Sequence, residues 1–435
     1  MANSRRVAVI GAGVAGLVTA RELRREDHRV VIFEKSNQLG GQWVYNPLVE
    51  TDPLSLDPNR EIIHSSLYKS LRTNLPKEVM SFTDYSFVEK AENRKRVNFP
   101  GHKEVLKFLN EFAEDYGIIE SIRFNSEVVR VEQVEFEGNR WVVRSKTDEF
   151  SSEELFDAVV ICNGHHTIPR IANIPGINNW PGKQMHSHNY RVPEPFMNQI
   201  VVVIGDGPSG LDICQDIATV AKQVHLSARS SEAEVSKLGN SANIWNHSKI
   251  DHVDESGVVS FLDGSSIHAD IILHCTGYKY DFPFLETNGI ISVDHEDRAV
   301  GPLYKHVFPP KLSPCLSFVG IPYQTIVFLT HELQAKWIAQ VLSGKVILPS
   351  EKMMLVDVAD HNRHLEEDGI PKHHTHCLHP HELEYMDWIA AQVGMPPVGA
   401  DLKEMYWSVY KCASVVGYDC CRDVWDIENF TQWSF

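Results

Sequence analysis

A short apolar strand that runs into a glycine-rich turn and then into a helix occurs twice in this chain, and this repeat constrains the fold more than any other feature. The first copy is the apolar run 7–10 followed by Gly11-Ala-Gly13-Val-Ala-Gly16. The second is the apolar run 200–204 followed by Gly205-Asp-Gly207-Pro-Ser-Gly210. A GxGxxG turn between a strand and a helix is typical of parallel sheets that bind a dinucleotide. We therefore predict two such sheets, each with its own nucleotide site.

The three glycines of each turn have separate roles in such a site. The first permits the tight turn, the second lets the backbone approach a pyrophosphate, and the third lets the helix pack on the strand. The helix N-terminus then faces the phosphates with its unpaired amide groups. The predicted cofactor-binding residues are Gly11, Gly13, Val14, Ala15 and Gly16 in the first copy, and Gly205, Gly207, Pro208, Ser209, Gly210, Leu211 and Asp212 in the second.

The residue that follows the second strand of each copy indicates which nucleotide is bound. In the first copy the strand 29–33 ends at Glu34, where a carboxylate can bind the hydroxyls of a ribose. In the second copy the strand 223–227 leads past an alanine to Arg229 and Ser230. A carboxylate repels a 2′-phosphate, whereas an arginine pairs with it. We therefore predict NADPH at the second copy; a solvated surface arginine is the alternative.

Composition excludes several classes of function. The chain has 58 acidic and 41 basic side chains and a formal net charge of −17, and it lacks the basic clusters that nucleic acid binding requires. No apolar run approaches the roughly 20 residues that cross a bilayer. Arg5-Arg6 and the apolar run after them resemble a signal peptide, but cleavage there would destroy the first glycine turn. Eight cysteines without a CxxC pair are typical of a reduced chain, so we expect a cytoplasmic protein.

Two dinucleotide sites in one chain indicate a flavin at the first site and a nicotinamide that reduces it from the second. Disulfide reductases share this layout, but they need a paired redox cysteine facing the flavin. Cys420 and Cys421 are adjacent near the C-terminus, and a vicinal pair is more often two structural thiols. Molecular oxygen is then the simplest acceptor for the electrons.

At 435 residues the chain exceeds the usual size of a single hydrophobic core. Proline-rich joints follow residue 168, and a buried strand ending in a glycine turn leads to Gly277. We predict an α/β fold with two Rossmann-like dinucleotide-binding domains, the NADP domain being inserted in the FAD domain. The predicted boundaries are 1–168 for the first part of the FAD domain, 169–276 for the NADP domain, and 277–435 for the second part of the FAD domain with a C-terminal extension.

Other elements follow from apolar periodicity and turn residues. Helices are predicted over 17–25, 102–116, 211–220 and 333–342, and strands over 123–144 with a break at Gly138-Asn139. The remainder of the chain after 342 is rich in histidine and aromatic residues and shows no periodicity that assigns an element.

A longer motif follows at Trp180-Pro-Gly-Lys-Gln-Met-His186-Ser-His-Asn-Tyr190. It resembles the FxGxxxHxxx(Y/F) signature of flavin-containing monooxygenases, whereas the motif of Baeyer–Villiger enzymes ends in tryptophan. Within that family the chain resembles the plant branch that S-oxygenates methylthioalkyl glucosinolates and S-alkyl cysteine derivatives. The segment Asp206-Gly207-Pro208 departs from the family's usual turn. Further segments that resemble the family are Glu34-Lys-Ser, Leu39-Gly-Gly-Gln-Trp43, Tyr68-Lys-Ser-Leu-Arg-Thr-Asn74, His274-Cys-Thr-Gly-Tyr278 and 301–310.

The resemblance implies an enzyme that uses FAD, NADPH and O2. In this family reduced flavin forms a C4a-hydroperoxyflavin, and retained NADP shields it until a nucleophile attacks the distal oxygen. A thioether sulfur attacks directly, so the task of the protein is positioning and desolvation. We therefore predict S-oxygenation of a small-molecule thioether to the sulfoxide, with an S-alkyl or S-allyl cysteine derivative or a methylthioalkyl glucosinolate as substrate.

The resemblance also implies residues beside the flavin. Asn74 is the predicted catalytic side chain, because its amide donates and accepts hydrogen bonds at once. A turn asparagine with a purely structural role is the alternative. The same resemblance implies cofactor contacts from Gln42 and Trp43 to FAD, from Thr73 to NADP, from Leu75 to the flavin and from Gln334 to the flavin ring.

Histidine-rich segments raise the question of a metal. His186 and His188 lack the further ligands of a site, so we expect a structural role for them at the domain joint. The segment 372–381 is denser in histidine, but its irregular spacing favours a solvated loop over a zinc site. We predict no metal.

The functional alternatives are N-oxygenation, decarboxylation of a 2-oxo acid as in auxin-forming relatives, an uncoupled NADPH oxidase releasing H2O2, and a redox-sensing protein that binds both cofactors without turnover.

Overall fold

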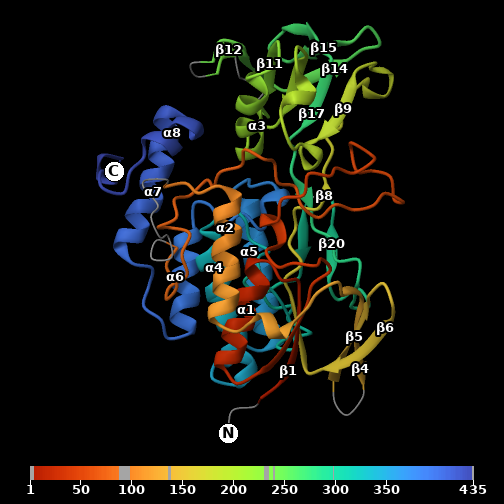
Figure 1. Cartoon of the computed structure of the whole chain (residues 1–435). Helices are drawn as coiled ribbons and strands as arrows, with labels where there is room; N and C mark the ends of the chain where they lie inside the picture. The colour runs from red at the N-terminus through yellow and green to blue at the C-terminus, as the bar shows by residue number, and fades with distance from the viewer. Residues whose placement is uncertain are drawn as a thin grey trace.

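The computed structural model of this chain describes residues 4–87, 98–135, 139–229, 235–238, 241–296 and 298–433. Two largely parallel sheets form its body (Figure 1). The strands of the first sheet are all parallel, because each is fed by a crossover connection. In spatial order they are β22 (Leu316–Phe318), β7 (Ala158–Ile161), β1 (Arg6–Ile10), β2 (Arg29–Phe33) and β3 (Ile122–Arg123).

The second sheet consists of strands that lie in sequence between β7 and β22. The chain therefore leaves the first sheet, builds the second and returns, as predicted for one domain inserted in another. Among the described strands of this sheet, only β12 runs antiparallel to its neighbour. The spatial order is β12 (Ser236–Lys237), β13 (Ile244–His247), β11 (Gln223–Ser227), β10 (Ile200–Ile204), β17 (Ile271–His274) and β9 (Lys183–His186).

The outgoing and returning connections run side by side. Strand β8 (Ile168–Pro169) of the outgoing connection pairs antiparallel with β18 (Tyr278–Lys279) of the returning one. Three smaller sheets account for the remaining strands in the described part of the chain. They are β19 (Leu285–Glu286), β4 (Glu127–Glu135), β5 (Asn139–Lys146) and β6 (Ser151–Phe156); β14 (Ile250–Val253), β15 (Val258–Phe261) and β16 (Ser266–His268); and β20 (Ser292–Asp294) with β21 (Ala299–Gly301).

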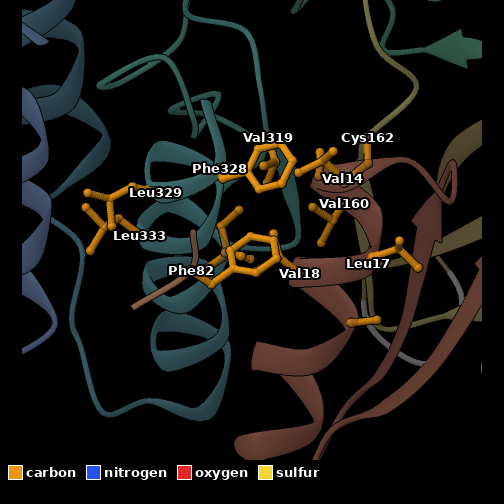
Figure 2. Packing of buried hydrophobic residues seen from close by; sticks show 14 of the residues in the cluster. Val14, Leu17, Val18, Phe82, Val160, Cys162, Val319, Phe328, Leu329 and Leu333 are labelled. Atoms are coloured by element: carbon orange, nitrogen blue, oxygen red, sulfur yellow. The ribbon is translucent and has the colours of Figure 1, made fainter. Parts of the chain in front are cut away.

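Four of the helices correspond to the predicted ones. They are α1 (Val14–Arg25), α2 (His102–Asp115), α3 (Pro208–Ala218) and α4 (Val327–Ser343). Helices α1 and α3 begin earlier than predicted, because the second glycine of each turn is itself the N-cap residue. Buried side chains of α1 and α4 face each other in the largest core cluster, where Phe82 and Phe328 stack with centroids 5.3 Å apart (Figure 2).

The C-terminal part, to which the sequence assigned no element, is helical. It forms α5 (Glu351–Glu367), α6 (Glu382–Gln392), α7 (Ala400–Val416) and α8 (Tyr418–Val424). Helix α5 buries only Met354 among its residues, so it lacks the apolar stripe that reveals a helix in a sequence. Helices α6 to α8 run along one side of the molecule, and α8 lies near α3 (Figure 1). Among the described residues, no helix is long and apolar enough to cross a membrane.

Candidate functional site

The third glycine of each turn is required by the fold itself. A Cβ atom at Gly16 would lie 1.9 Å from the carbonyl oxygen of Gly11, and one at Gly210 would lie 1.8 Å from that of Gly205. Gly11 and Gly205 both have a φ of 105°, which disfavours any residue with a side chain. The two turns are therefore alike in backbone geometry as well as in sequence.

The second glycine of the second turn is different, because the protein leaves space at that position. A Cβ atom at Gly207 would meet nothing within 4 Å, and the φ of −74° there suits any residue. The fold does not demand glycine at this position, whereas a phosphate group approaching the helix N-terminus would. The open cradle at Gly207 therefore fits a dinucleotide.

The first turn has a carboxylate beside it. Glu34 follows β2, and its Oε2 accepts a hydrogen bond of 2.8 Å from the backbone nitrogen of Ala12 within the turn. Its Oε1 accepts bonds from the backbone nitrogen and the hydroxyl of Ser36, at 2.9 and 2.8 Å. The structure thus holds the Glu34 side chain against the glycine turn, at the place predicted for a ribose ligand.

A second loop faces the first turn. Gly40 donates a backbone hydrogen bond of 3.0 Å to the carbonyl of Ala12, and the short helix Gly41–Trp43 follows. Trp43 packs partly buried against the core. Gln42 is exposed, and its Oε1 lies 2.6 Å from Nδ1 of His166. The fold therefore places both predicted residues of this loop near the first turn.

Arg229 lies after β11 at the second turn and is exposed. Its Nη1 lies 3.1 Å from Nε2 of His373. Arginine only donates hydrogen bonds, so Nε2 of this histidine accepts. Burial, followed by the nearby His374 and Arg229, lowers the pKa of His373 to about 4, which keeps the ring neutral. Within the described part of the chain no carboxylate pairs with Arg229, and the predicted Ser230 lies outside the described residues.

The predicted catalytic loop lies close to helices α3 and α8: Ser70 just before it bonds to Asp216 of α3, and Arg422 of α8 donates to the carbonyl of Thr73. Thr73 is buried, and its hydroxyl donates a 2.7 Å hydrogen bond to the carbonyl of Leu75. Leu75 is half-buried against the core. Asn74 between them is exposed, and its Oδ1 accepts a 2.5 Å hydrogen bond from Nη2 of Arg422. The loop therefore presents Asn74 outward while its neighbours anchor the backbone.

Asp212, predicted at the second turn, connects the two halves of the molecule. It lies in α3, and its Oδ2 accepts a 2.5 Å hydrogen bond from the hydroxyl of Tyr68. Its Oδ1 forms an ion pair with Arg422 of α8. Burial, reinforced by the charge of Asp212, raises the pKa of Tyr68 well above its usual range, so this phenol stays a hydrogen-bond donor.

The motif 180–190 contributes histidines that bond to a connection between the two sheets and to a buried carboxylate. His186 accepts a 3.0 Å bond at Nδ1 from the backbone nitrogen of His188, and its Nε2 lies 3.1 Å from the carbonyl oxygen of Gly277 on the return connection. Burial lowers the pKa of His186 to about 3. The Nε2 of His188 lies 3.2 Å from Oε1 of Glu50, which is also buried. These bonds agree with the structural role expected for both histidines.

Gln334 is fully buried in α4 and its amide is held at both ends. Its Oε1 accepts a 3.0 Å bond from the backbone nitrogen of Gly320, and its Nε2 lies 2.8 Å from the hydroxyl of Tyr385. That hydroxyl donates in turn to the carbonyl of Lys305. The amide thus fastens the turn at Gly320, while its predicted contact with a flavin ring stays a prediction.

The described residues contain neither a metal-binding group of side chains nor a disulfide bond. No group of three or more His, Cys, Asp or Glu side chains there is arranged to hold a metal ion. All eight cysteines are free, and of the vicinal pair Cys421 is buried whereas Cys420 is exposed. In the histidine-rich segment, His374 bonds to Tyr323 and His376 to the backbone of Val300.

Sequence reasoning missed Arg422, His373 and Tyr68 as parts of this site. Arg422 directly follows the vicinal cysteines, yet it is separated from Asn74 by 348 positions in the chain. No local pattern in one sequence marks such a partner. His373 stood in the histidine-rich segment, and only the fold brings it to Arg229.

Comparisons with known proteins agree with this architecture. The family model described as flavin-binding monooxygenase-like matches residues 4–247 and 241–426. The flavin-containing monooxygenase FMO GS-OX5 of Arabidopsis thaliana is 53% identical over 434 residues, which cover 98% of this chain and 93% of that protein. The solved S-allyl-L-cysteine S-oxygenase from Allium sativum superposes with a TM-score of 0.95 at 50% identity, covering 99% of this chain and 98% of that one. Tmm from a Pelagibacter species shares the fold, with a TM-score of 0.79 at 24% identity.

Proposed function

This chain belongs to the flavin-binding monooxygenase-like family and is an FAD-dependent NADPH monooxygenase, and from that premise we propose that it oxygenates the sulfur of a small thioether. The observation that carries the proposal is the match along nearly the whole chain to a solved S-allyl-L-cysteine S-oxygenase at 50% identity. An S-alkyl or S-allyl cysteine derivative is the first candidate substrate. A methylthioalkyl glucosinolate is the second, supported by the similarity to FMO GS-OX5.

In this proposal FAD is held at the first glycine turn and NADPH at the second. The carboxylate of Glu34 beside the first turn and the open cradle at Gly207 in the second support these placements. Arg229, which no described carboxylate neutralises, would bind the 2′-phosphate of NADPH. When bound and reduced, the flavin supplies the activation of molecular oxygen. We further assign residues 169–276 to the NADP-binding domain, supported by the pairing of β8 with β18 at its entrance and exit.

The protein itself contributes position and hydrogen bonding to the reaction. A sulfur lone pair is nucleophilic without deprotonation, so the transfer of one oxygen atom to it needs no protein base. The second oxygen atom leaves as water, with NADPH supplying the two electrons. Asn74 is exposed, and its amide nitrogen is a donor that can bind the reacting oxygen or the cofactor. We therefore propose Asn74 as the catalytic side chain of the S-oxygenase.

The proposed cellular location is the cytoplasm. All eight cysteines are free, and thiols of this kind persist in reducing compartments.

The test is a balance of NADPH consumed against sulfoxide and peroxide formed by the purified yellow protein. The substrates are S-allyl cysteine and a methylthioalkyl glucosinolate, with an aliphatic amine and a 2-oxo acid as controls. We expect one sulfoxide per NADPH with one of the thioethers. Peroxide with every substrate would make the protein an uncoupled oxidase, an N-oxide or a decarboxylated product would support the other oxygenase activities, and no NADPH consumption would leave a cofactor-binding protein.

A further inference from the structure

Helix α8 inserts one charged side chain between helix α3 and the loop that carries Asn74. The side chain of Arg422 is only 5% exposed. Its guanidinium forms an ion pair with Asp212 of α3 and donates hydrogen bonds to Oδ1 of Asn74, at 2.5 Å, and to the carbonyl oxygen of Thr73, at 3.1 Å. One planar group therefore contacts the helix of the second glycine turn and the loop that carries the proposed catalytic amide.

The chemistry of arginine decides how the Asn74 amide is turned. A guanidinium has five donors and no acceptor, so only the amide oxygen of Asn74 can face it. The amide nitrogen must then point away from Arg422. Asn74 is exposed, and an exposed amide without such a partner samples several rotamers. The bond from Arg422 thus selects the orientation in which the NH2 group is available to a ligand.

The same guanidinium is itself held in place. Asp212 receives the hydroxyl of Tyr68 on its other oxygen, at 2.5 Å, so its carboxylate cannot rotate freely. A planar guanidinium group that bonds to a carboxylate and a carbonyl group at once can rotate little. The position of the Asn74 amide therefore depends on the helix that follows the NADPH turn.

We propose that Arg422 is a positioning residue for oxygen transfer: it orients the amide of Asn74 and couples it to the helix of the nucleotide-binding turn through Asp212. The inference rests on the role proposed above for Asn74. Helix α8 then contributes a side chain to the oxygenation site, although the sequence indicated no element in this segment of the chain.

Helix α8 has anchors other than Arg422, so this side chain can be altered without removing the helix. Cys421 and Trp425 are each 1% exposed and pack in a core cluster with Phe99. On the surface, Asp423 pairs with Arg72 at 2.7 Å. Asp423→Asn is therefore the matched control, because it weakens the docking of α8 at a neighbouring position without touching Asn74.

The test uses Arg422→Lys, which keeps the positive charge for Asp212 but loses the planar fork, with Arg422→Ala as a second variant. Asn74→Ala and the double variant with Arg422→Lys complete a cycle. We measure sulfoxide and peroxide per NADPH, kcat and KM for NADPH, and the melting temperature. Hydrogen exchange of the backbone amides of residues 70–75 without substrate gives a readout that is independent of turnover.

We expect Arg422→Lys to lower sulfoxide per NADPH about tenfold with a matching rise in peroxide, to accelerate exchange in 70–75, and to change the KM for NADPH less than twofold to threefold. The double variant should resemble Asn74→Ala alone, because both changes act on one amide. Asp423→Asn should behave as the unaltered protein. Normal coupling in Arg422→Lys, or multiplied losses in the double variant, would overturn the inference while leaving the proposed function intact. Normal coupling in Asn74→Ala would instead remove the role of Asn74 and this inference with it.

Discussion

The phenolic hydroxyl of Tyr190 donates a hydrogen bond of 2.6 Å to Oδ2 of Asp216 in helix α3. Ser70 donates to the same oxygen at 2.7 Å. Tyr190 is only 1% exposed, and burial together with the hydrogen bond to Asp216 raises its pKa well above the usual range. The last residue of the 180–190 motif thus fastens the helix of the second glycine turn to the segment that follows β9 of the same sheet, and Ser70 adds a bond to that carboxylate from a loop outside it.

We expect Tyr190→Phe to lower the free energy of unfolding by about 1–2 kcal/mol, because it removes a buried hydrogen bond to a carboxylate. Denaturant unfolding with a constant slope measures the change. Ser70→Ala should cost less, since Asp216 keeps the bond from Tyr190. Equal stabilities of Tyr190→Phe and the unaltered protein would show that this bond contributes nothing net.

Substitution by alanine should have different effects at Gly207 and Gly210: one should weaken NADPH binding and the other should prevent folding. Gly210→Ala forces a Cβ atom to 1.8 Å from a backbone oxygen, so we expect loss of the folded protein. Gly207→Ala meets no protein atom within 4 Å, so the protein should fold and keep its FAD while the KM for NADPH rises at least about tenfold, that is 1.4 kcal/mol. Flavin absorbance and steady-state kinetics distinguish the two. An unchanged KM in Gly207→Ala would place the pyrophosphate elsewhere.

Arg229→Ala should raise the KM for NADPH about tenfold or more and leave that for NADH within about twofold, because only NADPH carries the 2′-phosphate that a charge-assisted bond would bind. Arg229→Lys is the control and should recover part of the NADPH affinity, since it restores a charge without the planar fork. The same loss with both nucleotides would end the assignment of the phosphate to Arg229.

Asn74→Ala should keep bound yellow FAD and continue to oxidise NADPH, while sulfoxide formation falls on the order of 100-fold and peroxide replaces it. The expected size is that of removing one hydrogen-bond donor from a reacting oxygen. Product analysis against NADPH consumption is the measurement. Asn74→Asp, which keeps the shape but lacks the NH2 donor, should be equally impaired; if it were active, the amide donor would not be the essential group.

Acid sensitivity should come in part from Glu50. Burial would raise the pKa of Glu50, but hydrogen bonds led by that from His188 lower it to about 2, from a usual value of 4.5. Because the folded-state pKa is the lower one, this stabilisation is present above about pH 4.5 and is lost as the pH falls towards 2. Its partner Arg60 lies 2.6 Å away, and both side chains are almost fully buried.

Glu50→Gln should therefore lower the free energy of unfolding at neutral pH by about 3–5 kcal/mol, since it leaves the Arg60 charge unpaired, and should flatten the decline between pH 4.5 and 2. Unfolding curves across that range measure both effects. Glu149→Gln, at an exposed carboxylate, is the control. A variant with the same acid profile as the unaltered protein would place the sensitivity at other groups.

Apolar periodicity predicted α2 because its buried residues recur at helical spacing. Helix α4 is buried on nearly every side, and only its segment 333–342 was predicted. Periodicity failed at α5, whose exposed face carries Met353, Leu355 and Val356 while only Met354 is buried. The hydrophobic pattern of such a helix does not indicate a core, so no periodicity could assign it.

The two glycine turns could be predicted from the chain alone, because their requirements are local: a positive φ at Gly11 and Gly205, and no space for a side chain at Gly16 and Gly210. Glycine alone meets these conditions, and it can be read directly from the chain. The surroundings of Asn74, in contrast, depend on contacts that form only when the chain folds. The guanidinium that orients its amide comes from a helix 348 positions away, and the strength of such a contact depends on burial and distance in space, which no spacing in the sequence records.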